Sequence, residues 1–185
     1  MIIVIDGNIG SGKSTVLDRL AQKGYTVCKE KIEEWPLDDF YKDPSRWAFL
    51  LQMSVLNSMH RLPEPNIIIH ERCPDSSLAV FWENISDKGI VSQRENSVCK
   101  ELYTKLAWKP DLHIFLDSNP MTCYERVSKR NQMGDTSVKL GYILQIDSYY
   151  KKYISNRNIK IIKSDREIDA VVDDVLCTIN EFIAV

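Results

Sequence analysis

The chain has 185 residues, of which 44% are hydrophobic and 27% are charged, and this length is enough to bury a core without metals or disulfides. Its 24 Lys and Arg residues against 26 Asp and Glu residues give a formal net charge of −2, so the composition supplies no overall attraction to nucleic acid or to an anionic membrane. The five cysteines are an odd number, widely spread and without a C-x-x-C pair, which excludes a disulfide framework or a zinc site. With no signal-peptide pattern and no apolar run near the roughly 20 residues that span a bilayer, we expect a cytoplasmic protein in a reducing compartment.

Five short apolar runs divide the chain and predict strands. They do not alternate between apolar and polar residues, which is typical of strands buried on both faces of a parallel sheet. The runs are Ile2–Ile5, Tyr25–Cys28, Ile67–Ile69, Leu112–Leu116 and Ile159–Ile162.

Between these runs, apolar residues recur at helical spacing in residues 16–21, 48–59, 138–153 and 168–183. Helix starts are predicted at Ser118-Asn119-Pro120 and at Ser164-Asp165. Strands that alternate with helices predict an α/β, three-layer fold with a five-stranded parallel sheet flanked by helices. No repeat or linker divides the chain, so we expect residues 1–185 to form a single domain. The pattern does not predict the strand order.

The segment Gly7-Asn8-Ile9-Gly10-Ser11-Gly12-Lys13-Ser14 matches the phosphate-binding loop G-x-x-x-x-G-K-[ST] in full. It directly follows a predicted strand and opens a predicted helix, which is the context that the mechanism needs. Backbone amides and the helix N-terminus would surround phosphate oxygens, Lys13 would reach the β- and γ-phosphates, and Ser14 would hold Mg²⁺. The motif predicts nucleoside triphosphate binding, and the chain has no N-K-x-D for guanine.

Charged residues follow three of the predicted strands, where ligands gather in such sheets. Glu30 could accept a proton from an attacking hydroxyl, although Glu30, Glu33 and Glu34 are equally compatible with a solvated acidic loop. The pair Glu71-Arg72 could hold the water shell of a metal and clamp phosphoryl oxygens, or form a structural ion pair. Asp117 competes with Glu71 for the metal, and spacing does not decide between them.

Together these segments resemble the deoxyribonucleoside kinase family, which includes deoxycytidine, deoxyguanosine and mitochondrial thymidine kinases and the insect broad-specificity kinase. The phosphate-binding loop through Thr15 is similar to that of the family. So are four further segments in the same order, up to about residue 155: Tyr41-Lys42-Asp43-Pro44-Ser45-Arg46-Trp47-Ala48 with Gln52, Glu71-Arg72-Cys73, Phe81-Trp82-Glu83-Asn84, and Tyr124-Glu125-Arg126-Val127-Ser128-Lys129-Arg130.

The resemblance implies a P-loop kinase fold and transfer of the ATP γ-phosphoryl group to the 5′-hydroxyl of a deoxynucleoside, with Mg²⁺. Glu30 would be the general base, and Arg72 and Lys13 would complete the catalytic set. Ser14 and Glu71 would serve the metal. ATP would be bound by residues 7–15 (Gly7, Asn8, Ile9, Gly10, Ser11, Gly12, Lys13, Ser14 and Thr15) with Arg126 and Arg130.

For the nucleoside, the resemblance implies that Gln52 pairs with the base edge, Phe81 stacks on the base, Trp35 walls the pocket, and Tyr41 and Asp135 bind the 3′-hydroxyl. The implied substrate set also includes Leu51, Glu30 and Arg72. Met59 and Ser77 stand where the deoxycytidine enzyme has an Arg and an Asp at the base. That difference predicts a pyrimidine preference, with thymidine as the leading substrate.

Three residues depart from the family pattern: Gln132 replaces an arginine of the lid at residues 126–137, Lys31 replaces a proline, and Cys73 replaces a serine. They motivate one alternative, a catalytically reduced nucleotide-binding subunit. The other alternative is a nucleoside monophosphate kinase of the thymidylate type, which would need more basic residues for the acceptor phosphate. Deoxynucleoside and ATP are the expected ligands, nucleic acid and membrane are not expected partners, and the resemblance implies a homodimer.

Overall fold

The computed structural model describes residues 1–59, 67–130 and 134–184. Within them the predicted strands form a five-stranded sheet in the order β2-β3-β1-β4-β5, and every neighbouring pair is parallel. The strands are β1 (Ile2–Gly7), β2 (Thr26–Cys28), β3 (Ile68–Glu71), β4 (Leu112–Asp117) and β5 (Lys160–Lys163). The predicted five-stranded parallel sheet is confirmed.

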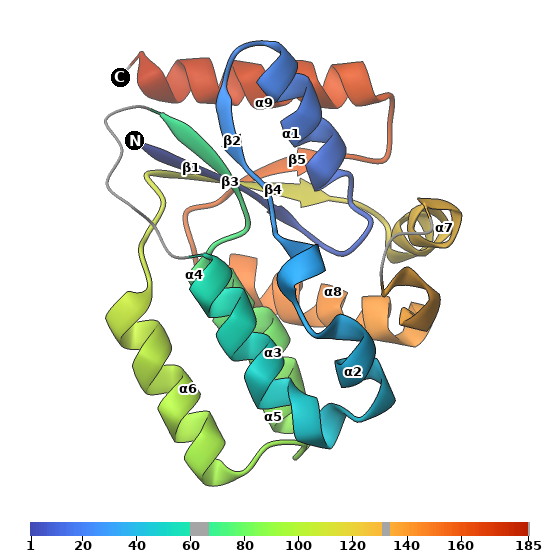
Figure 1. Ribbon diagram of the computed structural model, residues 1–185. Helices are drawn as coiled ribbons and strands as arrows, with labels where there is room; N and C mark the ends of the chain where they lie inside the picture. The colour runs from blue at the N-terminus through green and yellow to red at the C-terminus, as the bar shows by residue number, and fades with distance from the viewer. Residues whose placement is uncertain (60–66, 131–133, 185) are drawn as a thin grey trace.

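Helices cover both faces of this sheet (Figure 1). They are α1 (Lys13–Gln22), α2 (Leu37–Lys42), α3 (Pro44–Ser58), α4 (Pro74–Ser76), α5 (Glu83–Asp87), α6 (Gln93–Leu106), α7 (Pro120–Arg130), α8 (Leu140–Ile154) and α9 (Ile168–Ile183), with the 3₁₀ turns η1 (Ile32–Glu34) and η3 (Asp135–Ser137) and the π-helical turn η2 (Ser77–Trp82). Helices α1 and α9 pack on one face, and α8 with η2 packs on the other. The three-layer α/β prediction is therefore confirmed.

The burial of the strands follows their place in the sheet. All six residues of the central strand β1 are buried, as are five of the six in β4, because helices cover both faces there. The edge strands β2 and β5 are more open, and Ile161 in β5 is 54% exposed. The prediction that the strands are buried on both faces therefore holds for the central strands β1 and β4 and not for the edge strands β2 and β5.

One predicted helix start is wrong. Helix α9 begins at Ile168, not at Ser164-Asp165. The Asp165 carboxylate instead accepts hydrogen bonds from Ser118 Oγ and from the backbone N of Asn119 (2.6 Å), so it ties the β5–α9 loop to the start of α7. Asp165 is thus a residue type that often caps helices, but here its side chain bonds to a neighbouring loop.

Helix α6 was not predicted, although its start carries a readable signal. Ser92 Oγ accepts a hydrogen bond from the backbone N of Glu95 (3.2 Å), and the Glu95 carboxylate accepts one from the backbone N of Ser92 (2.7 Å). This reciprocal capping box begins the helix that lies beside α3 (Figure 1).

Two expectations about the whole chain can be compared with the structure. Within the described residues, no helix has both the length and the apolar character needed to cross a membrane. None of the cysteines Cys28, Cys73, Cys99, Cys123 and Cys177, all of them within the described residues, forms a disulfide bond.

Candidate active site

The phosphate-binding loop turns from β1 into α1 with backbone angles that favour glycine. Gly10 has a φ of 81°, and a Cβ there would lie 2.3 Å from the carbonyl oxygen of Cys123 in α7. Gly12, with a φ of 97°, caps α1. The glycines therefore let the loop pass close to α7 and aim the helix N-terminus at the space where phosphates would lie.

Two cavities meet at this loop. The first has a volume of about 900 Å³ including its open mouth, and the second has about 1000 Å³. Both are lined by Gly10, Lys13, Ser14 and Arg130. A group held in one cavity would thus approach a group held in the other beside Lys13 and Ser14.

Lys13 lies where the two cavities meet, a place called the junction below, and its side chain is turned back onto the loop. Its Nζ donates to the carbonyl oxygens of Gly7 (3.1 Å) and Asn8 (2.9 Å). Burial, with the Arg72 charge nearby, lowers the pKa of Lys13 to about 8. The ammonium is therefore costly to bury, and an anion at the junction would stabilise it.

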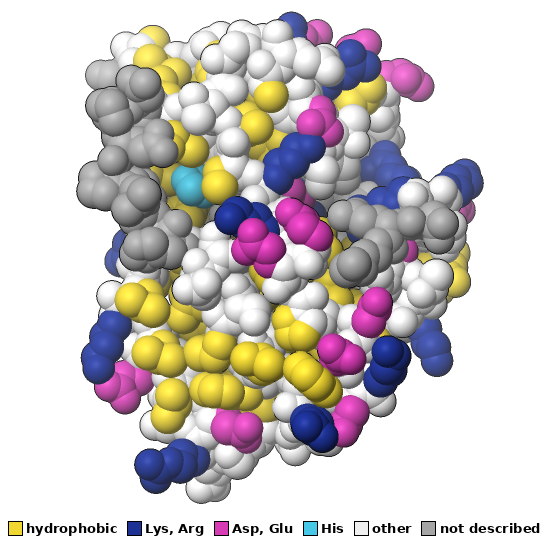
Figure 2. All heavy atoms as spheres, viewed as in Figure 1, with side chains coloured by type: hydrophobic (Ala, Val, Ile, Leu, Met, Phe, Trp, Pro, Cys, Tyr) yellow, Lys and Arg dark blue, Asp and Glu magenta, His cyan; other side chains and the backbone are white. Residues whose placement is uncertain are grey.

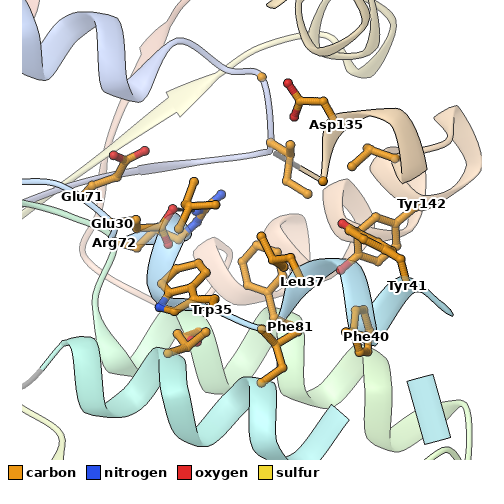
Figure 3. Close-up of a pocket in the computed structure, with 18 of the residues that line it drawn as sticks. Glu30, Trp35, Leu37, Phe40, Tyr41, Glu71, Arg72, Phe81, Asp135 and Tyr142 are labelled. Carbon is orange, nitrogen blue, oxygen red and sulfur yellow. Dashed lines mark hydrogen bonds and ion pairs between the residues drawn. The ribbon is translucent and has the colours of Figure 1, made fainter. Parts of the chain in front are cut away.

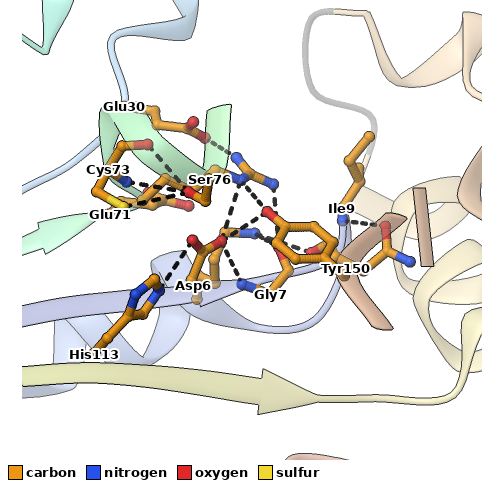
Figure 4. Close-up of polar contacts among 12 residues, drawn as sticks. Asp6, Gly7, Ile9, Glu30, Glu71, Cys73, Ser76, His113 and Tyr150 are labelled. Carbon is orange, nitrogen blue, oxygen red and sulfur yellow. Dashed lines mark hydrogen bonds and ion pairs between the residues drawn. The ribbon is translucent and has the colours of Figure 1, made fainter. Parts of the chain in front are cut away.

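Glu30 and Arg72 form a buried ion pair at the loop end of the first cavity (Figures 3 and 4). Their side chains are 5% and 7% exposed, so Glu30 does not belong to a solvated acidic loop. Burial raises the pKa of Glu30, and the Arg72 charge opposes that rise. The carboxylate is thus held beside a cation and close to the phosphate-binding loop.

Arg72 is fixed from several sides (Figure 4). Its Nε donates to Tyr150 Oη (3.0 Å), which donates to Asp6 Oδ1 (2.7 Å), and its Nη2 donates to the Gly7 carbonyl (3.3 Å). Arg72 also has a φ of 62°, a conformation that non-glycine residues rarely adopt and that is concentrated at functional sites. Its position is therefore set by the fold and not by a ligand.

Asp6 is the fully buried anchor of this network. Burial opposes its ionisation, but the hydrogen bond and charge of His113, whose Nε2 lies 3.3 Å from Oδ2, and the charge of Arg72 outweigh that cost. The pKa of Asp6 consequently lies well below its ordinary value. Sequence reasoning missed Asp6 and Tyr150. A lone carboxylate at the end of an apolar strand before the loop was a signal for Asp6, whereas Tyr150 had none.

Ser14 and Glu71 supply oxygen atoms suited to Mg²⁺. Ser14 Oγ donates to Glu71 Oε1 (3.0 Å), and both residues line the first cavity beside Lys13. A hydroxyl and a carboxylate are hard oxygen ligands, so this pair fits the metal that the sequence implied. Asp117, the competing candidate, forms an ion pair with Lys163 and lies outside the lining of both cavities.

The far end of the first cavity is largely neutral. Gln52 and Leu51 reach it from α3, Trp35 from the loop after η1, and Ser77 and Phe81 from η2. Figure 3 shows Trp35 and Phe81 between the Glu30–Arg72 pair and Tyr41. Because η2 is a π-helical turn, it alters the angular spacing within the continuous helix that runs from Pro74 to Asp87, a feature that often occurs at functional sites.

Tyr41 and Asp135 also line this cavity, as the sequence predicted. Asp135 accepts two hydrogen bonds from Arg130, both of 2.8 Å. Burial and the Asp135 charge raise the pKa of Tyr41 to about 12, so its hydroxyl stays protonated. Gln132, the substituted residue of the predicted lid, lies outside the described residues.

The second cavity is lined by the expected phosphate-side residues Gly10, Ser11, Gly12, Lys13, Ser14, Thr15, Arg126 and Arg130. Arg126 is held there by the carbonyl oxygens of Ser11 (3.4 Å) and Ser164 (3.0 Å). Arg166 also lines it and was not predicted, because an isolated arginine after a short strand carries no distinguishing pattern.

Four predicted contacts are not placed as expected. Met59 does not line the first cavity, because it caps the C-terminus of α3 and packs against Val55 and Ile85 instead. Ile9 lines the first cavity and not the second. Gly7 and Asn8 line neither cavity. Their carbonyl groups hold Lys13, and Asn8 Nδ2 donates to the Ile143 carbonyl (3.0 Å), so they shape the loop.

Sequence reasoning also missed apolar and aromatic wall residues that come from separate elements. Leu37 and Phe40 come from α2, Val55 from α3, Ile85 from α5 and Tyr142 from α8. Tyr142 already belonged to the predicted apolar stripe of α8, but the stripe could not show which of its members face a cavity.

Comparisons with known proteins identify the family and the fold of this chain. The profile of the deoxynucleoside kinase family matches residues 3–184. The protein of Invertebrate iridescent virus 3 named as kinase protein 029R is 32% identical over 182 residues, which cover 95% of this chain and 94% of that protein. Human mitochondrial thymidine kinase 2 is 26% identical over 195 residues, which cover 93% of this chain and 74% of that enzyme.

Among solved structures, deoxyadenosine kinase from M. mycoides with dCMP and dCDP bound has the same fold. The TM-score is 0.85 at 23% sequence identity, and the match covers 98% of this chain and 99% of that one. With a phosphate-binding loop between two cavities and a family profile that spans nearly the whole sequence, this chain belongs to the deoxynucleoside kinase family.

Proposed function

We propose that this kinase transfers the γ-phosphoryl group of ATP to the 5′-hydroxyl of a deoxyribonucleoside, with thymidine preferred, to give the 5′-monophosphate and ADP. The observation that carries the proposal is the junction of the two cavities at Lys13 and Ser14, with Glu30 and Arg72 on the acceptor side. ATP occupies the second cavity, and the nucleoside occupies the first.

The side chains at the junction divide the chemistry between them. Glu30 accepts the proton of the attacking 5′-hydroxyl, whose oxygen forms the new bond to the γ-phosphorus as the bond to the β-phosphate oxygen breaks. Arg72, held by Tyr150 and the Gly7 carbonyl, orients that hydroxyl and stabilises charge on the phosphoryl oxygens. Lys13 contacts the β- and γ-phosphates.

Mg²⁺ is the proposed cofactor, held through the Ser14 hydroxyl and, by way of its water shell, the Glu71 carboxylate. When bound it neutralises phosphate charge. The hydrogen bond between these two side chains keeps both oxygens on the same side of the junction.

The far end of the first cavity, called the base end below, is suited to the base of a pyrimidine nucleoside, thymidine included. Gln52 offers a donor and an acceptor, Phe81 and Trp35 offer aromatic faces, and Ser77 supplies a neutral hydroxyl. A neutral serine in place of a carboxylate favours a base whose edge carries carbonyl groups. The sugar would be held through Tyr41 and Asp135.

The charge of the first cavity, called the acceptor cavity below, favours a nucleoside over a nucleoside monophosphate as the acceptor. Among the described residues that line it, three cations (Lys13, Arg72 and Arg130) accompany three carboxylates (Glu30, Glu71 and Asp135). An acceptor that already carries a phosphate would need a net positive wall. This balance argues against the thymidylate-kinase alternative.

The alternative of a catalytically reduced subunit has less support. Lys31 lies on the surface, paired with Glu34 (3.2 Å), and Cys73 is a buried thiol against Ser76, so neither substitution removes a group from the junction.

An ADP-release assay with ATP, Mg²⁺ and each of the four deoxynucleosides or their 5′-monophosphates separates the three functions. The proposal predicts ADP release with deoxynucleosides, fastest with thymidine, and none with the monophosphates. Release only with monophosphates would identify a nucleotide kinase, and ATP binding without release would identify the reduced subunit. Activity with purines alone would overturn the thymidine preference.

A homodimer is proposed through the face formed by α3 and α6. Hydrophobic side chains gather there in Figure 2. The exposed large hydrophobic residues of these two helices are Leu50 in α3 and Val98 and Leu106 in α6. An exposed apolar band of this kind is typical of an interface. Light scattering should give twice the monomer mass for the unmodified protein. The Leu50→Glu variant should have the mass of a single monomer.

We further propose that residues 1–185 act as one P-loop nucleoside kinase domain with a lid at residues 126–137, and that the protein works in the cytoplasm. The salt bridge from Arg130, at the end of α7, to Asp135 in η3 links the two described sides of that lid. None of the five cysteines, which all lie in the described part of the chain, is in a disulfide bond, and this is compatible with a reducing compartment.

A further inference from the structure

A buried tyrosine lies directly behind the base end of the acceptor cavity. Tyr103 of α6 is 1% exposed and does not line the cavity, yet its hydroxyl reaches two side chains that do. It lies 3.1 Å from Ser77 Oγ and donates to Gln52 Oε1 at 3.4 Å. The two polar groups of the cavity that face the base are therefore joined through one phenol.

The proton on that phenol makes the three groups interdependent. Burial raises the pKa of Tyr103 above its ordinary value, so the hydroxyl remains neutral and has a single hydrogen to donate. While it donates to Gln52 Oε1, the bond to Ser77 has to come from the Ser77 hydroxyl. Ser77 then presents lone pairs to the cavity, and the Gln52 amide is held with its oxygen toward α6.

The same three groups also have a reversed arrangement. If the Gln52 amide turns over, its NH₂ group donates to Tyr103 Oη, Tyr103 donates to Ser77 Oγ, and the Ser77 hydrogen is released toward the cavity. A hydroxyl accepts and donates equally well, so neither arrangement leaves a buried polar atom of the relay without a partner. Turning the amide therefore carries no desolvation penalty at its buried end.

We propose that Tyr103 is a specificity-determining residue that acts through Gln52 and Ser77 as a reversible hydrogen-bond relay. The relay sets how the kinase discriminates a base edge with an amino group beside a ring acceptor from one with a carbonyl beside a ring N–H. This rests on the proposed function, because it assigns the base to the end of the cavity lined by Gln52 and Ser77.

Deoxycytidine and deoxyuridine are the sharpest probes, since they differ only along that edge. The measured quantity is the ratio of their kcat/KM values. Tyr103→Phe keeps the buried ring and removes the relay, so we expect the ratio to shift at least fivefold from that of the unmodified enzyme, with the KM for ATP unchanged. Tyr149→Phe is the matched control, because it removes a tyrosine hydroxyl that is bonded to Asp87 on the surface, and its ratio should stay within twofold.

A second variant tests whether Tyr103 acts through Ser77. Ser77→Ala breaks the relay at its other end, so the double variant with Tyr103→Phe should shift the ratio by much less than the product of the two single shifts. A melting curve of each variant confirms that it is folded.

The outcomes are distinct from those that test the proposed function. If the unmodified enzyme phosphorylates no deoxynucleoside, the proposed function is wrong. If it is active but folded Tyr103→Phe changes both kcat/KM values equally, or leaves the ratio within twofold, Tyr103 only packs the core. Multiplicative shifts in the double variant would likewise overturn the relay.

Discussion

The two ends of the acceptor cavity are built from opposite kinds of side chain. At the junction with the phosphate-binding loop, Lys13, Glu30 and Arg72 are buried together with Asp6 beneath them. At the base end, neutral groups such as Gln52, Ser77 and Phe81 lie among apolar walls. In the proposed arrangement, charge is concentrated where phosphoryl transfer needs it, and the base is selected by shape and by a few hydrogen bonds.

This contrast makes the two ends respond differently to substitution. Changes at the junction should act mainly on kcat, because the groups there interact with the transition state. Changes at the base end should act mainly on the KM for the nucleoside.

The largest effect is expected for Glu30→Gln. Removal of the proposed general base should lower kcat by about 10²- to 10⁴-fold with little change in the nucleoside KM, because the amide keeps the shape of the side chain. Steady-state kinetics with thymidine measure both constants. Glu33→Gln is the matched control on the exposed part of the same loop and should retain full activity. A kcat unchanged in Glu30→Gln would remove Glu30 from the base role.

Arg72→Lys should lower kcat by about 10²-fold. Lysine keeps the charge, but it cannot contact Glu30, Tyr150 and the Gly7 carbonyl at once as the guanidinium does. The exposed Arg157→Lys is the matched control and should behave as the unmodified enzyme. If Arg72→Lys were as active as the control, charge alone would account for Arg72, and its fixed geometry would not matter.

At the base end, Gln52→Leu should raise the nucleoside KM by about 10-fold and lower kcat by less, because the base loses one or two hydrogen bonds while the cavity keeps its shape. Gln145→Leu, on the exposed side of α8, controls for the loss of an amide. A loss that fell entirely on kcat would contradict the division between the two ends.

The pH dependence of kcat gives a smaller but specific test. Burial raises the pKa of Glu30 above the ordinary value of 4.5, and only the deprotonated carboxylate can act as a base. Activity should therefore be full above this raised pKa and decline about tenfold per pH unit below it, with the midpoint above pH 4.5. A midpoint at 4.5 would place Glu30 in solvent, and a midpoint below 4.5 would mean that the Arg72 charge outweighs the effect of burial. In Glu30→Gln this acid limb should vanish.

The division also explains what could be predicted from the sequence. The phosphate-binding loop is contiguous, and Glu30, Glu71 and Arg72 lie at the ends of the neighbouring strands β2 and β3, so their meeting at one sheet edge follows from parallel topology. The Asp6–Tyr150 bond joins residues 144 positions apart and leaves no local pattern. Family spacing placed Met59 at the base, whereas the end of α3 turns it into an apolar cluster with Val55 and Ile85.

Elements without a strong periodic pattern were the least predictable. Helix α6 carries mostly polar residues, and its role behind the cavity depends on one buried hydroxyl, that of Tyr103. The π-helical turn that presents Ser77 and Phe81 packs against α8, and a long-range contact of this kind leaves no local pattern in the sequence.

The most direct test of the proposed arrangement is the site of phosphorylation on thymidine. With Glu30 at the junction and Asp135 near Tyr41, the 5′-hydroxyl should face the γ-phosphate. After reaction with ATP and Mg²⁺, phosphorus–proton NMR of the isolated product should show coupling to the two 5′ protons only. A phosphate coupled to the 3′ proton, or no nucleotide product, would contradict it.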